Sequence, residues 1–320
     1  MDRAFGIFFY ADVKDACARA GFEDTIFADD LNAFLEVASV VSNDILLGWA
    51  GQCQVEVHAW GVANGVSFEP TKESMHIISR HEPAGDNFDL LGVTYDTKLT
   101  MEDEVSRLAS ECSWKTTQLL RVGSFYDAEQ LILLYKQQVL SYVEYRTAAI
   151  YHAADTVLEP LEAVQNRILR AVGISEIDAL IHMKLAPLRT RRDIAVLGII
   201  HRTVLGRGPE LLKSIIKIAK VSVGYPLRTT RLAANRHRLQ VEEKCEGSHT
   251  DYLMRSLAGA ISIYNLLPPY IVEDAPTVPK FQGKCQALVL ERAKAGFADW
   301  SLSLSPRLPR HCHPLLSALM

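Results

Sequence analysis

The hydrophobic pattern of the chain changes near residue 100, and this change restricts the folds that the chain can adopt. Before residue 100, short β-prone runs alternate with stretches of helical spacing. After it, apolar residues recur at helical spacing and strand-like runs almost vanish. A segment of mixed strands and helices followed by helices alone is typical of the α+β class, so an α+β fold is expected.

The first hundred residues carry clear signals for where their elements end. Gly21 ends one predicted helix and Asn64-Gly65 ends another, because these residue types tolerate the left-handed conformation that follows helices. Runs rich in β-branched and aromatic residues predict strands. The predicted elements are a helix over residues 5–20, strands at 25–28 and 31–37, a helix from Asn43 or Asp44 to Asn64, and strands at 74–79 and 88–95.

Helices dominate the predictions beyond residue 100. Asp127 and Gln130 have the spacing of a capping box at the start of a long helix. Pro160 can open a second helix, and Thr190 with Asp193 can cap a third. The apolar stripes of these helices are expected to pack into an ordinary hydrophobic core.

Composition excludes several classes of protein. Hydrophobic residues make up 48% and charged residues 22% of the chain, which is ordinary for a folded protein. The six cysteines include no C-x-x-C pair, so a zinc ribbon and a compact disulfide framework are not expected, and a reducing intracellular compartment is favoured. The start does not resemble a secretory signal, and no run of about 20 apolar residues predicts a membrane span. His311, Cys312 and His313 lack a second ligand pair, so no zinc is assigned.

Charge is distributed unevenly along the chain. Residues 1–100 hold 6 basic and 16 acidic side chains, whereas residues 201–320 hold 17 basic and 9 acidic ones. Residues 211–241 include no acidic side chain, and such a stretch can bind nucleic-acid phosphates without recognising sequence. A solvated basic helix and loop is the alternative. The basic residues proposed for this contact are Lys213, Lys217, Lys220, Arg228, Arg231, Arg236 and Arg238. The first three share the spacing of one helical face.

The adjacent pair Asp29-Asp30 is the strongest candidate for chemistry. The pair follows Phe27-Ala28 and lies between two β-prone runs, so it is expected at the tip of a hairpin. Neighbouring carboxylates supply hard oxygen ligands, which suit Mg²⁺ bound between a protein and substrate phosphates. The alternative is a solvated turn, since Asp is common in turns.

Further short motifs accompany this pair in a defined order. They are FYADV at residues 9–13, GF at 21–22, FADD at 27–30, Trp60, Asn64-Gly65, Lys72, FDLLGV at 88–93, RAVG at 170–173, RRDIAVLG at 191–198, HR at 201–202, YNLLP at 264–268 and Phe281. Each motif alone is unspecific. In this order, over most of the chain, they resemble the C-terminal part of the reverse transcriptases of LINE-type non-LTR retrotransposons.

The resemblance implies an architecture and an activity. A partial polymerase palm is expected in residues 1–98, a helical thumb-like region in residues 99–206, and a basic C-terminal region in residues 207–320. The implied activity is RNA-directed DNA polymerisation with Mg²⁺, and the implied partners are an RNA template and a DNA primer. No membrane partner is implied.

The resemblance also implies roles for particular residues. Asp29 and Asp30 are expected to be catalytic metal ligands, and Lys72 is expected near the phosphates of the incoming nucleotide. Leu91 and Gly92 are expected to shape the primer grip, where a glycine permits close approach of the backbone. A solvated surface lysine is the alternative for Lys72, and an ordinary strand bend is the alternative for Gly92.

One departure from the family pattern limits the expected activity. The family places a further catalytic Asp on a strand upstream of the hairpin, followed by a Gln-Gly loop, and neither fits between Met1 and the hairpin. Asp12 and Asp15 lie nearby, but on the predicted helix. The chain is therefore expected to be truncated and unable to polymerise DNA by itself. The alternatives are a non-catalytic nucleic-acid-binding remnant and an unstable gene fragment.

Overall fold

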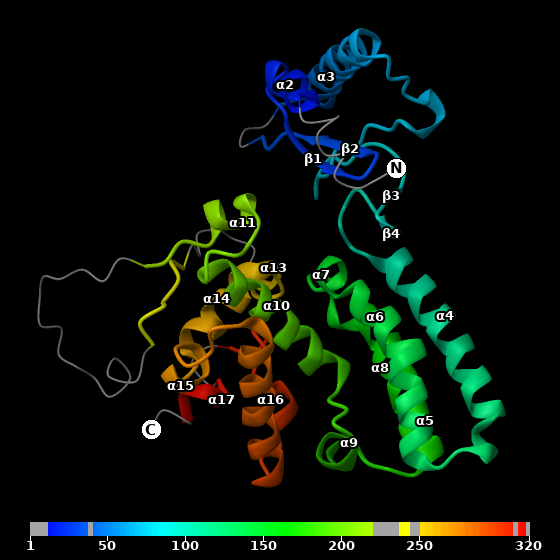
Figure 1. Ribbon diagram of the computed structural model, residues 1–320, viewed down its shortest axis with the longest axis vertical. Coiled ribbons are helices and arrows are strands. Elements are labelled where there is room, and N and C mark those ends of the chain that lie inside the picture. The colour runs from blue at the N-terminus through cyan, green and yellow to red at the C-terminus, as the bar shows by residue number, and fades with distance from the viewer. Residues whose placement is uncertain (1–11, 38–40, 220–236, 244–249, 310–312, 318–320) are drawn as a thin grey trace, which may run out of the picture. The chain divides into compact units, whose positions relative to one another are not determined.

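The computed structural model describes residues 12–37, 41–219, 237–243, 250–309 and 313–317 (Figure 1). The chain separates into two compact units, Met1–Leu99 and Thr100–Met320. The described residues are mostly helical and include two antiparallel sheets of two strands each, which confirms the α+β class. None of the described helices is both long and apolar enough to cross a bilayer.

The first unit begins with a helix, a hairpin and a longer helix. These elements are α2 (Val13–Arg19), β1 (Glu23–Phe27), β2 (Asp30–Phe34) and α3 (Asn43–Asn64). The strands predicted on either side of Asp29 thus pair with each other. Gly21 and Gly65 have positive φ angles of 81° and 67° after the two helices, as their sequence positions predicted. The N-cap of α3 is Ser42, one residue before the predicted start.

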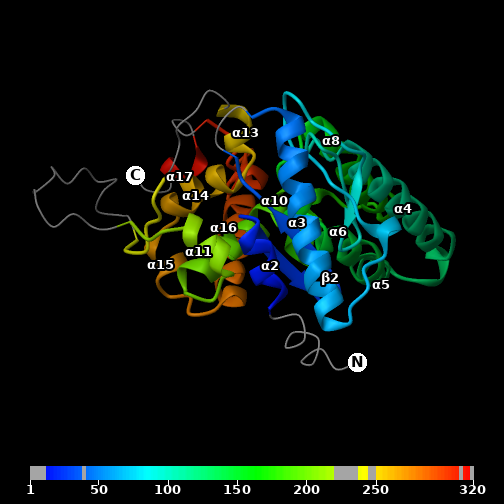
Figure 2. The same cartoon turned by 90° about the horizontal axis from the view of Figure 1, so that it is seen from above.

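The two helices and one face of the hairpin enclose a small core. Helix α2 packs against α3 and leads directly into β1 (Figures 1 and 2). The buried residues of this core are Val13, Ala16, Cys17, Cys53, Val57 and Trp60, and the partly buried Ala20, Phe22, Ile26, Leu31, Val66 and Phe68 pack against them. Because burial of apolar surface is the main stabilising term in folding, this contact holds the hairpin on the helices.

The remainder of the first unit contains little regular structure. Its elements are a 3₁₀ turn, η1 (Pro70–Lys72), and the strands β3 (Phe88–Leu90) and β4 (Val93–Tyr95). The strand predicted at residues 74–79 is wrong, because only an isolated bridge between Ile77 and Ala84 forms there. Pro83 cannot donate to a ladder and Gly85 has a φ of 94°, so the pairing does not extend beyond Ala84.

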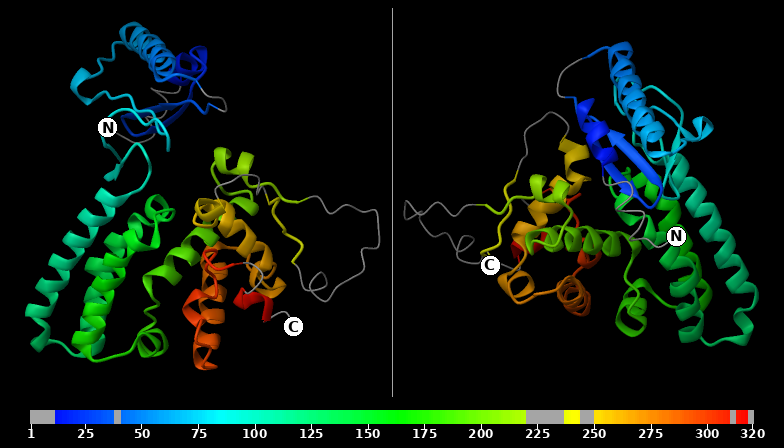
Figure 3. Two further views of the ribbon diagram at one scale, coloured as in Figure 1. Left: turned by 180° about the vertical axis from the view of Figure 1, so that it is seen from behind. Right: turned by 45° about the horizontal axis from the view of Figure 1, so that its top comes forward.

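The second unit opens with a helical bundle (Figure 3). Its elements are α4 (Glu102–Arg121), η2 (Gly123–Phe125), α5 (Ala128–Tyr135), the π-helical turn η3 (Lys136–Leu140), α6 (Ser141–Tyr145), α7 (Thr147–Ile150) and α8 (Asp155–Val172). The predicted capping box is confirmed: Asp127 Oδ1 accepts from the Gln130 amide at 2.8 Å, and Gln130 Oε1 accepts from the Asp127 amide at 3.1 Å.

A buried ion pair joins α4 to the end of α6 inside this bundle. The carboxylate of Glu104, which is only 1% exposed, accepts hydrogen bonds from Arg146 at 2.7 Å and from Arg107 at 2.6 Å. The Arg146 guanidinium also lies 4.2 Å from the centre of the Tyr142 ring. A buried carboxylate requires such partners, because an unpaired buried charge costs several kcal/mol, about 3–5 when one partner is removed.

Two predicted helix starts are wrong. Pro160 lies inside α8, which begins at Asp155, so the proline is accommodated in the early part of the helix rather than opening it. Helix α10 (Leu188–Val204) has Pro187 as its N-cap. The hydroxyl of Thr190, predicted to cap this helix, donates to the carbonyl of Ser301 at 2.8 Å. A tertiary contact has therefore replaced the local cap that the sequence spacing suggested.

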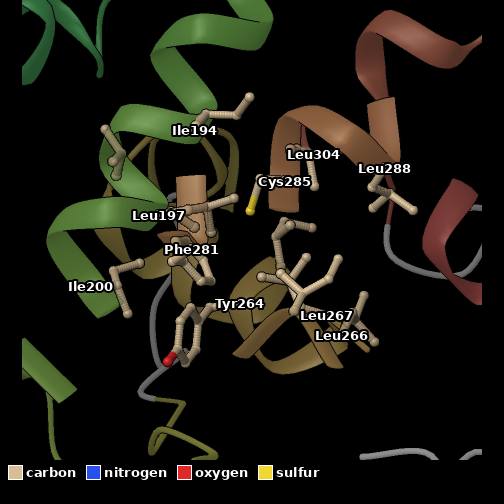
Figure 4. Packing of buried hydrophobic residues seen from close by; sticks show 14 of the residues in the cluster. Ile194, Leu197, Ile200, Tyr264, Leu266, Leu267, Phe281, Cys285, Leu288 and Leu304 are labelled. Carbon is tan, nitrogen blue, oxygen red and sulfur yellow. The ribbon is translucent and has the colours of Figure 1, made fainter. Parts of the chain in front are cut away.

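The second half of this unit packs its helices around α10. The remaining elements are α9 (Glu176–Met183), α11 (Glu210–Ile215), α13 (Thr250–Met254), α14 (Leu257–Leu266), α15 (Pro269–Val272), α16 (Val278–Lys294), η4 (Trp300–Leu302) and α17 (Pro314–Ser317). Leu197, Tyr264 and Phe281 meet in one core (Figure 4). A side chain at Gly198 would approach the Gln282 amide nitrogen to 2.6 Å, so Gln282 would have to move to accommodate it.

The predicted boundary at residues 206/207 does not separate two units. The core that contains Ile194, Leu197 and Ile200 of α10 also contains Tyr264 of α14 and Phe281 of α16. The expected thumb-like region and C-terminal region therefore share one hydrophobic core, and the second unit runs continuously from Thr100. A boundary placed by the resemblance and by the basic stretch missed this packing, because basic residues on a surface do not exclude an apolar interior.

Asp193 is buried within α10, where it accepts a 3.0 Å hydrogen bond from the hydroxyl of Tyr151. Burial raises the pKa of its carboxyl from 3.8 to about 7, although the Tyr151 bond and the charges of Arg192 and Arg307 act in the opposite direction. The protonated carboxyl is therefore favoured in the folded state over a wider pH range than in an unfolded chain.

Replacing Asp193 by Asn is expected to stabilise the second unit increasingly as the pH rises from about 4 to about 7. The folded-state pKa lies above the unfolded value, so the acid contributes stability below its unfolded pKa and loses that contribution as the pH rises through the folded pKa. The gain is on the order of 4 kcal/mol at most, because one pKa unit corresponds to about 1.4 kcal/mol.

Thermal unfolding from pH 4 to pH 8 measures this difference. Glu159→Gln, which removes an exposed carboxyl from α8, is the control and should leave the pH profile unchanged. An Asp193→Asn variant that is less stable than the parent at pH 8 would mean that the ionised carboxylate is stabilised by the neighbouring arginines.

Candidate metal-binding hairpin

The turn between β1 and β2 consists of Ala28 and Asp29. The five register pairs of the hairpin run from Glu23–Phe34 to Phe27–Asp30, which leaves these two residues to reverse the chain. Ala28 has a φ of 56°, whereas Asp29 is not among the residues with positive φ. This pattern matches a type II′ turn, whose twist suits antiparallel strands and whose first central position normally holds glycine.

The register decides which face of the hairpin carries each side chain. Ile26 and Leu31 are directly opposite each other, and both pack against the core of α2 and α3. Side chains alternate between faces along a strand, so the next pair, Phe27 and Asp30, points away from the helices. Phe27 is 56% exposed, which agrees with its position on this open face.

Asp29 and Asp30 are both exposed, and no hydrogen bond or ion pair with a described residue engages either carboxylate. The tip therefore presents two adjacent negative charges to solvent without a compensating cation among the described residues. In the part of the chain that the structure describes, no group of three or more His, Cys, Asp or Glu residues is arranged to hold a metal ion. Two carboxylates nevertheless fit Mg²⁺, which commonly keeps several waters and completes its ligands with substrate phosphates.

Lys72 is exposed at the end of the 3₁₀ turn η1, where its backbone N–H donates to the carbonyl of Glu69 at 2.9 Å. The next residue anchors this loop to α3. Glu73 accepts a 2.5 Å hydrogen bond from Gln54 and lies 3.0 Å from His58 Nε2. The bond from Gln54, followed by the contact with His58, lowers the pKa of the Glu73 carboxyl.

Glu73 was not singled out from the sequence, although it determines where the Lys72 loop attaches. Its partners are 19 and 15 residues away along the chain. Its only sequence signal is its position directly after Lys72, and that signal does not name a partner. The contact depends on the loop returning to the middle of α3, which local patterns do not encode.

Leu91 and Gly92 form the turn between β3 and β4. Their φ angles are 51° and 76°, and two positive φ angles are the pattern of a type I′ hairpin turn. Leu91 is 42% exposed at this tip. The aromatic ring of Phe88 stacks on that of Tyr95, with centroids 5.6 Å apart. Residues 88–95, predicted as strand, are therefore a tight hairpin whose turn exposes Leu91.

The predicted site residues thus occupy three separate turns of the first unit. The structure places Asp29 and Asp30 next to each other at the β1–β2 turn. Lys72 lies at the end of η1, and Leu91-Gly92 lies at the β3–β4 turn. Comparison with known protein families, curated proteins and solved structures gave no match.

The predicted basic residues are only partly described. Lys213 lies in α11 and is paired with Glu210 at 2.5 Å, whereas Lys217 and Arg238 are exposed. The expectation that the first three lysines share one helical face is wrong for the two described. Helix α11 ends at Ile215, and Ile218 forms an antiparallel bridge with Val241. The remaining four, Lys220, Arg228, Arg231 and Arg236, lie outside the described residues.

The side chain of Asn265 holds Val241, the partner of Ile218 in this bridge. Its side-chain Oδ1 accepts from the Val241 amide at 2.9 Å, and its Nδ2 donates to the Val241 carbonyl at 2.8 Å. The buried Ile216 and Val241 join the core of the second unit. His313, the described member of the terminal His-Cys-His run, is likewise buried and bonds the Ser305 carbonyl at 3.0 Å.

Replacing Ala28 by Gly is expected to stabilise the hairpin by about 0.5–1 kcal/mol. The positive φ of Ala28 costs an L-residue roughly 1–2 kcal/mol, and glycine adopts it at little cost. Part of this gain is offset, because glycine has more conformational freedom in the unfolded chain. Ala33→Gly in β2 is the matched control, and it should destabilise by about 0.5–1 kcal/mol. Amide hydrogen exchange over residues 23–34 measures both changes. Slower exchange in the Ala33→Gly variant than in the Ala28→Gly variant would contradict the assigned turn.

Proposed function

We propose that the first unit holds metal-bound phosphates at the Asp29-Asp30 turn, as part of an RNA-directed DNA polymerase of the LINE-type retrotransposon class. The observation that supports this proposal is the presentation of two adjacent carboxylates, unpaired among the described residues, on the exposed tip of a hairpin. The proposed substrates are deoxynucleoside triphosphates and a DNA primer on an RNA template. The proposed cofactor is Mg²⁺.

The roles come from the resemblance, and the chemistry of each residue at its observed position is compatible with its role. Asp29 and Asp30 would hold Mg²⁺, which when bound neutralises phosphate charge and orients phosphate oxygens. Lys72 is exposed and its side chain has a flexible four-carbon stem, so its ammonium group can approach a polyphosphate as a point charge. The Leu91-Gly92 turn offers an exposed apolar tip and a backbone without a side chain at Gly92, where a primer strand can approach closely.

The number of carboxylates limits what the isolated chain is proposed to do. Two-metal phosphoryl transfer requires ligands that hold a pair of ions roughly 3.5–4 Å apart. The described residues contribute two neighbouring carboxylates to the turn and no third acidic, histidine or cysteine ligand close by. We therefore expect metal-dependent nucleotide binding by the chain alone, without extension of a primer.

Asp29→Asn and Asp30→Asn are each expected to weaken binding of a Mn²⁺–deoxynucleoside triphosphate complex at least about tenfold, or about 1.4 kcal/mol, by removing one oxygen ligand charge. Mn²⁺ replaces Mg²⁺ so that electron paramagnetic resonance can follow the bound ion. Glu23→Gln is the matched control, because it removes a charge from the same open face at the far end of β1. Equal weakening by all three variants would indicate general electrostatics rather than a site at the turn.

A second candidate is nucleic-acid binding without catalysis. It is favoured by the exposure of Lys217 and Arg238 in a stretch whose sequence contains no acidic residue from 211 to 241. Both residues flank residues 220–236 in the sequence, which add four further positive charges. A polymerase would also use such a surface, so the two candidates differ in metal-dependent nucleotide binding at the Asp29-Asp30 turn rather than in RNA binding.

Changing Lys217 and Arg238 together to Ala is expected to reduce the salt dependence of single-stranded RNA binding, by roughly 0.7 in log–log slope for each phosphate that is no longer neutralised. Lys213→Ala is the control, since Lys213 is already paired with Glu210.

A primer-extension assay with RNA template and Mg²⁺ should give no product. An unchanged slope would exclude the phosphate contacts, and robust extension would exclude the non-catalytic candidate.

A further inference from the structure

The segment that follows α3 folds back along one face of that helix. The ring of Phe68 lies so close to Gly61 that a Cβ added there would be 2.8 Å from it, and the same ring stacks on His58 with centroids 5.4 Å apart. Glu73 then contacts Gln54, one turn nearer to the start of α3. Gln54, His58 and Gly61 are spaced by four and three residues, so they share one helical face.

The Glu73 carboxylate is held by two donors of this face. Its Oε2 accepts a 2.5 Å hydrogen bond from Gln54 Nε2, and both of its oxygens lie 3.0 Å from His58 Nε2. The bond from Gln54, followed by the contact with His58, lowers the pKa of the Glu73 carboxyl, which favours its charged form. An ionised carboxylate only accepts hydrogen bonds, so His58 Nε2 carries a proton here. We call these three side chains the Glu73 clasp.

Lys72 lies between two acidic residues of the same loop, Glu69 and Glu73. Either carboxylate would compete with a phosphate if it paired with the lysine, because opposite charges attract. The Glu69 carboxylate instead accepts a 2.9 Å hydrogen bond from the Thr71 hydroxyl, and Glu73 is bonded to α3. In the described part of the chain no ion pair involves Lys72, which is exposed. Both neighbouring acids therefore have partners other than the lysine.

We propose that Gln54 and His58 keep the Glu73 carboxylate from pairing with Lys72, which leaves the charge of the lysine available to a phosphate. The two residues are positioning residues that act through Glu73 and Lys72, and the phosphate itself rests on the proposed function. Without the two donors, the Glu73 side chain can turn toward the neighbouring ammonium group. That exposed ion pair weakens phosphate binding by about two- to fivefold, which is the usual worth of a pair of opposite charges at a surface.

A clasp that only fastened the loop would respond differently to substitution. Removing Gln54 and His58 would then loosen the loop, and removing the charge of Glu73 as well would not restore Lys72. In the proposed arrangement the released carboxylate is itself the inhibitor. Glu73→Gln therefore restores Lys72 in a chain that lacks both donors, although it removes the last member of the clasp.

The test measures how fast acetic anhydride acylates Lys72 in the folded full chain, by peptide mass spectrometry with the exposed Lys294 of α16 as internal reference. An ammonium group paired with a carboxylate releases its proton less readily, so it is acylated more slowly. The double variant Gln54→Ala, His58→Ala is expected to slow acylation of Lys72 about two- to fivefold without changing Lys294. Adding Glu73→Gln should restore the parent rate. Adding Glu69→Gln instead is the matched control and should not.

An unchanged rate in the double variant would overturn the proposal, and so would failure of Glu73→Gln to restore it. Equal restoration by Glu69→Gln would mean general electrostatics and would overturn it too. Glu73→Gln alone keeps the test independent of how the double variant folds. It should leave the parent rate unchanged, whereas faster acylation would show that Glu73 already pairs with Lys72.

Binding of the Mn²⁺–deoxynucleoside triphosphate complex by the same chains separates this proposal from the proposed function. Binding should follow the order of the acylation rates, with loss in the double variant and recovery on adding Glu73→Gln. If acylation follows the expected pattern while Lys72→Ala leaves nucleotide binding unchanged, the clasp stands and the phosphate role of Lys72 falls.

Discussion

The register of one short hairpin determines the candidate site. Ile26 and Leu31 face each other and pack on the α2–α3 core, and this packing sends Phe27 and Asp30 to the opposite face. A slip of one residue would exchange the faces, burying a carboxylate and exposing two apolar side chains. The apolar contact therefore specifies where the charge is presented, and every proposed role of Asp29 and Asp30 depends on it.

The second unit shows how polar side chains specify a mainly apolar interior. Leu197, Tyr264 and Phe281 bring α10, α14 and α16 together. His201 fixes their relative orientation, because its ring stacks on Phe281 with centroids 4.2 Å apart and bonds the Tyr264 hydroxyl at 3.0 Å. In the bundle, the Glu104–Arg146 pair has the same effect on α4 and α6. Such groups are costly to bury without partners, so they favour the one arrangement that supplies them.

The functional proposal combines a resemblance with local geometry. The ordered motifs suggested which residues carry chemistry. In the described structure these residues, Asp29-Asp30, Lys72 and Leu91-Gly92, lie in three turns. Glu73 was missed, yet its bonds to Gln54 and His58 attach the Lys72 loop to α3. An anchoring carboxylate of this kind has no local signature, because its partners come from another element.

Sequence alone determined the features that depend on neighbouring residues. The Asp127–Gln130 capping box, the glycines that follow α2 and α3, and the hairpin around Asp29 follow from local backbone preferences. Tertiary structure alone decided which distant residues meet. Asp193 with Tyr151 and Asn265 with Val241 are separated widely in the chain. Their pairing is set by how helices pack, because burial rewards the whole arrangement and no short pattern records it.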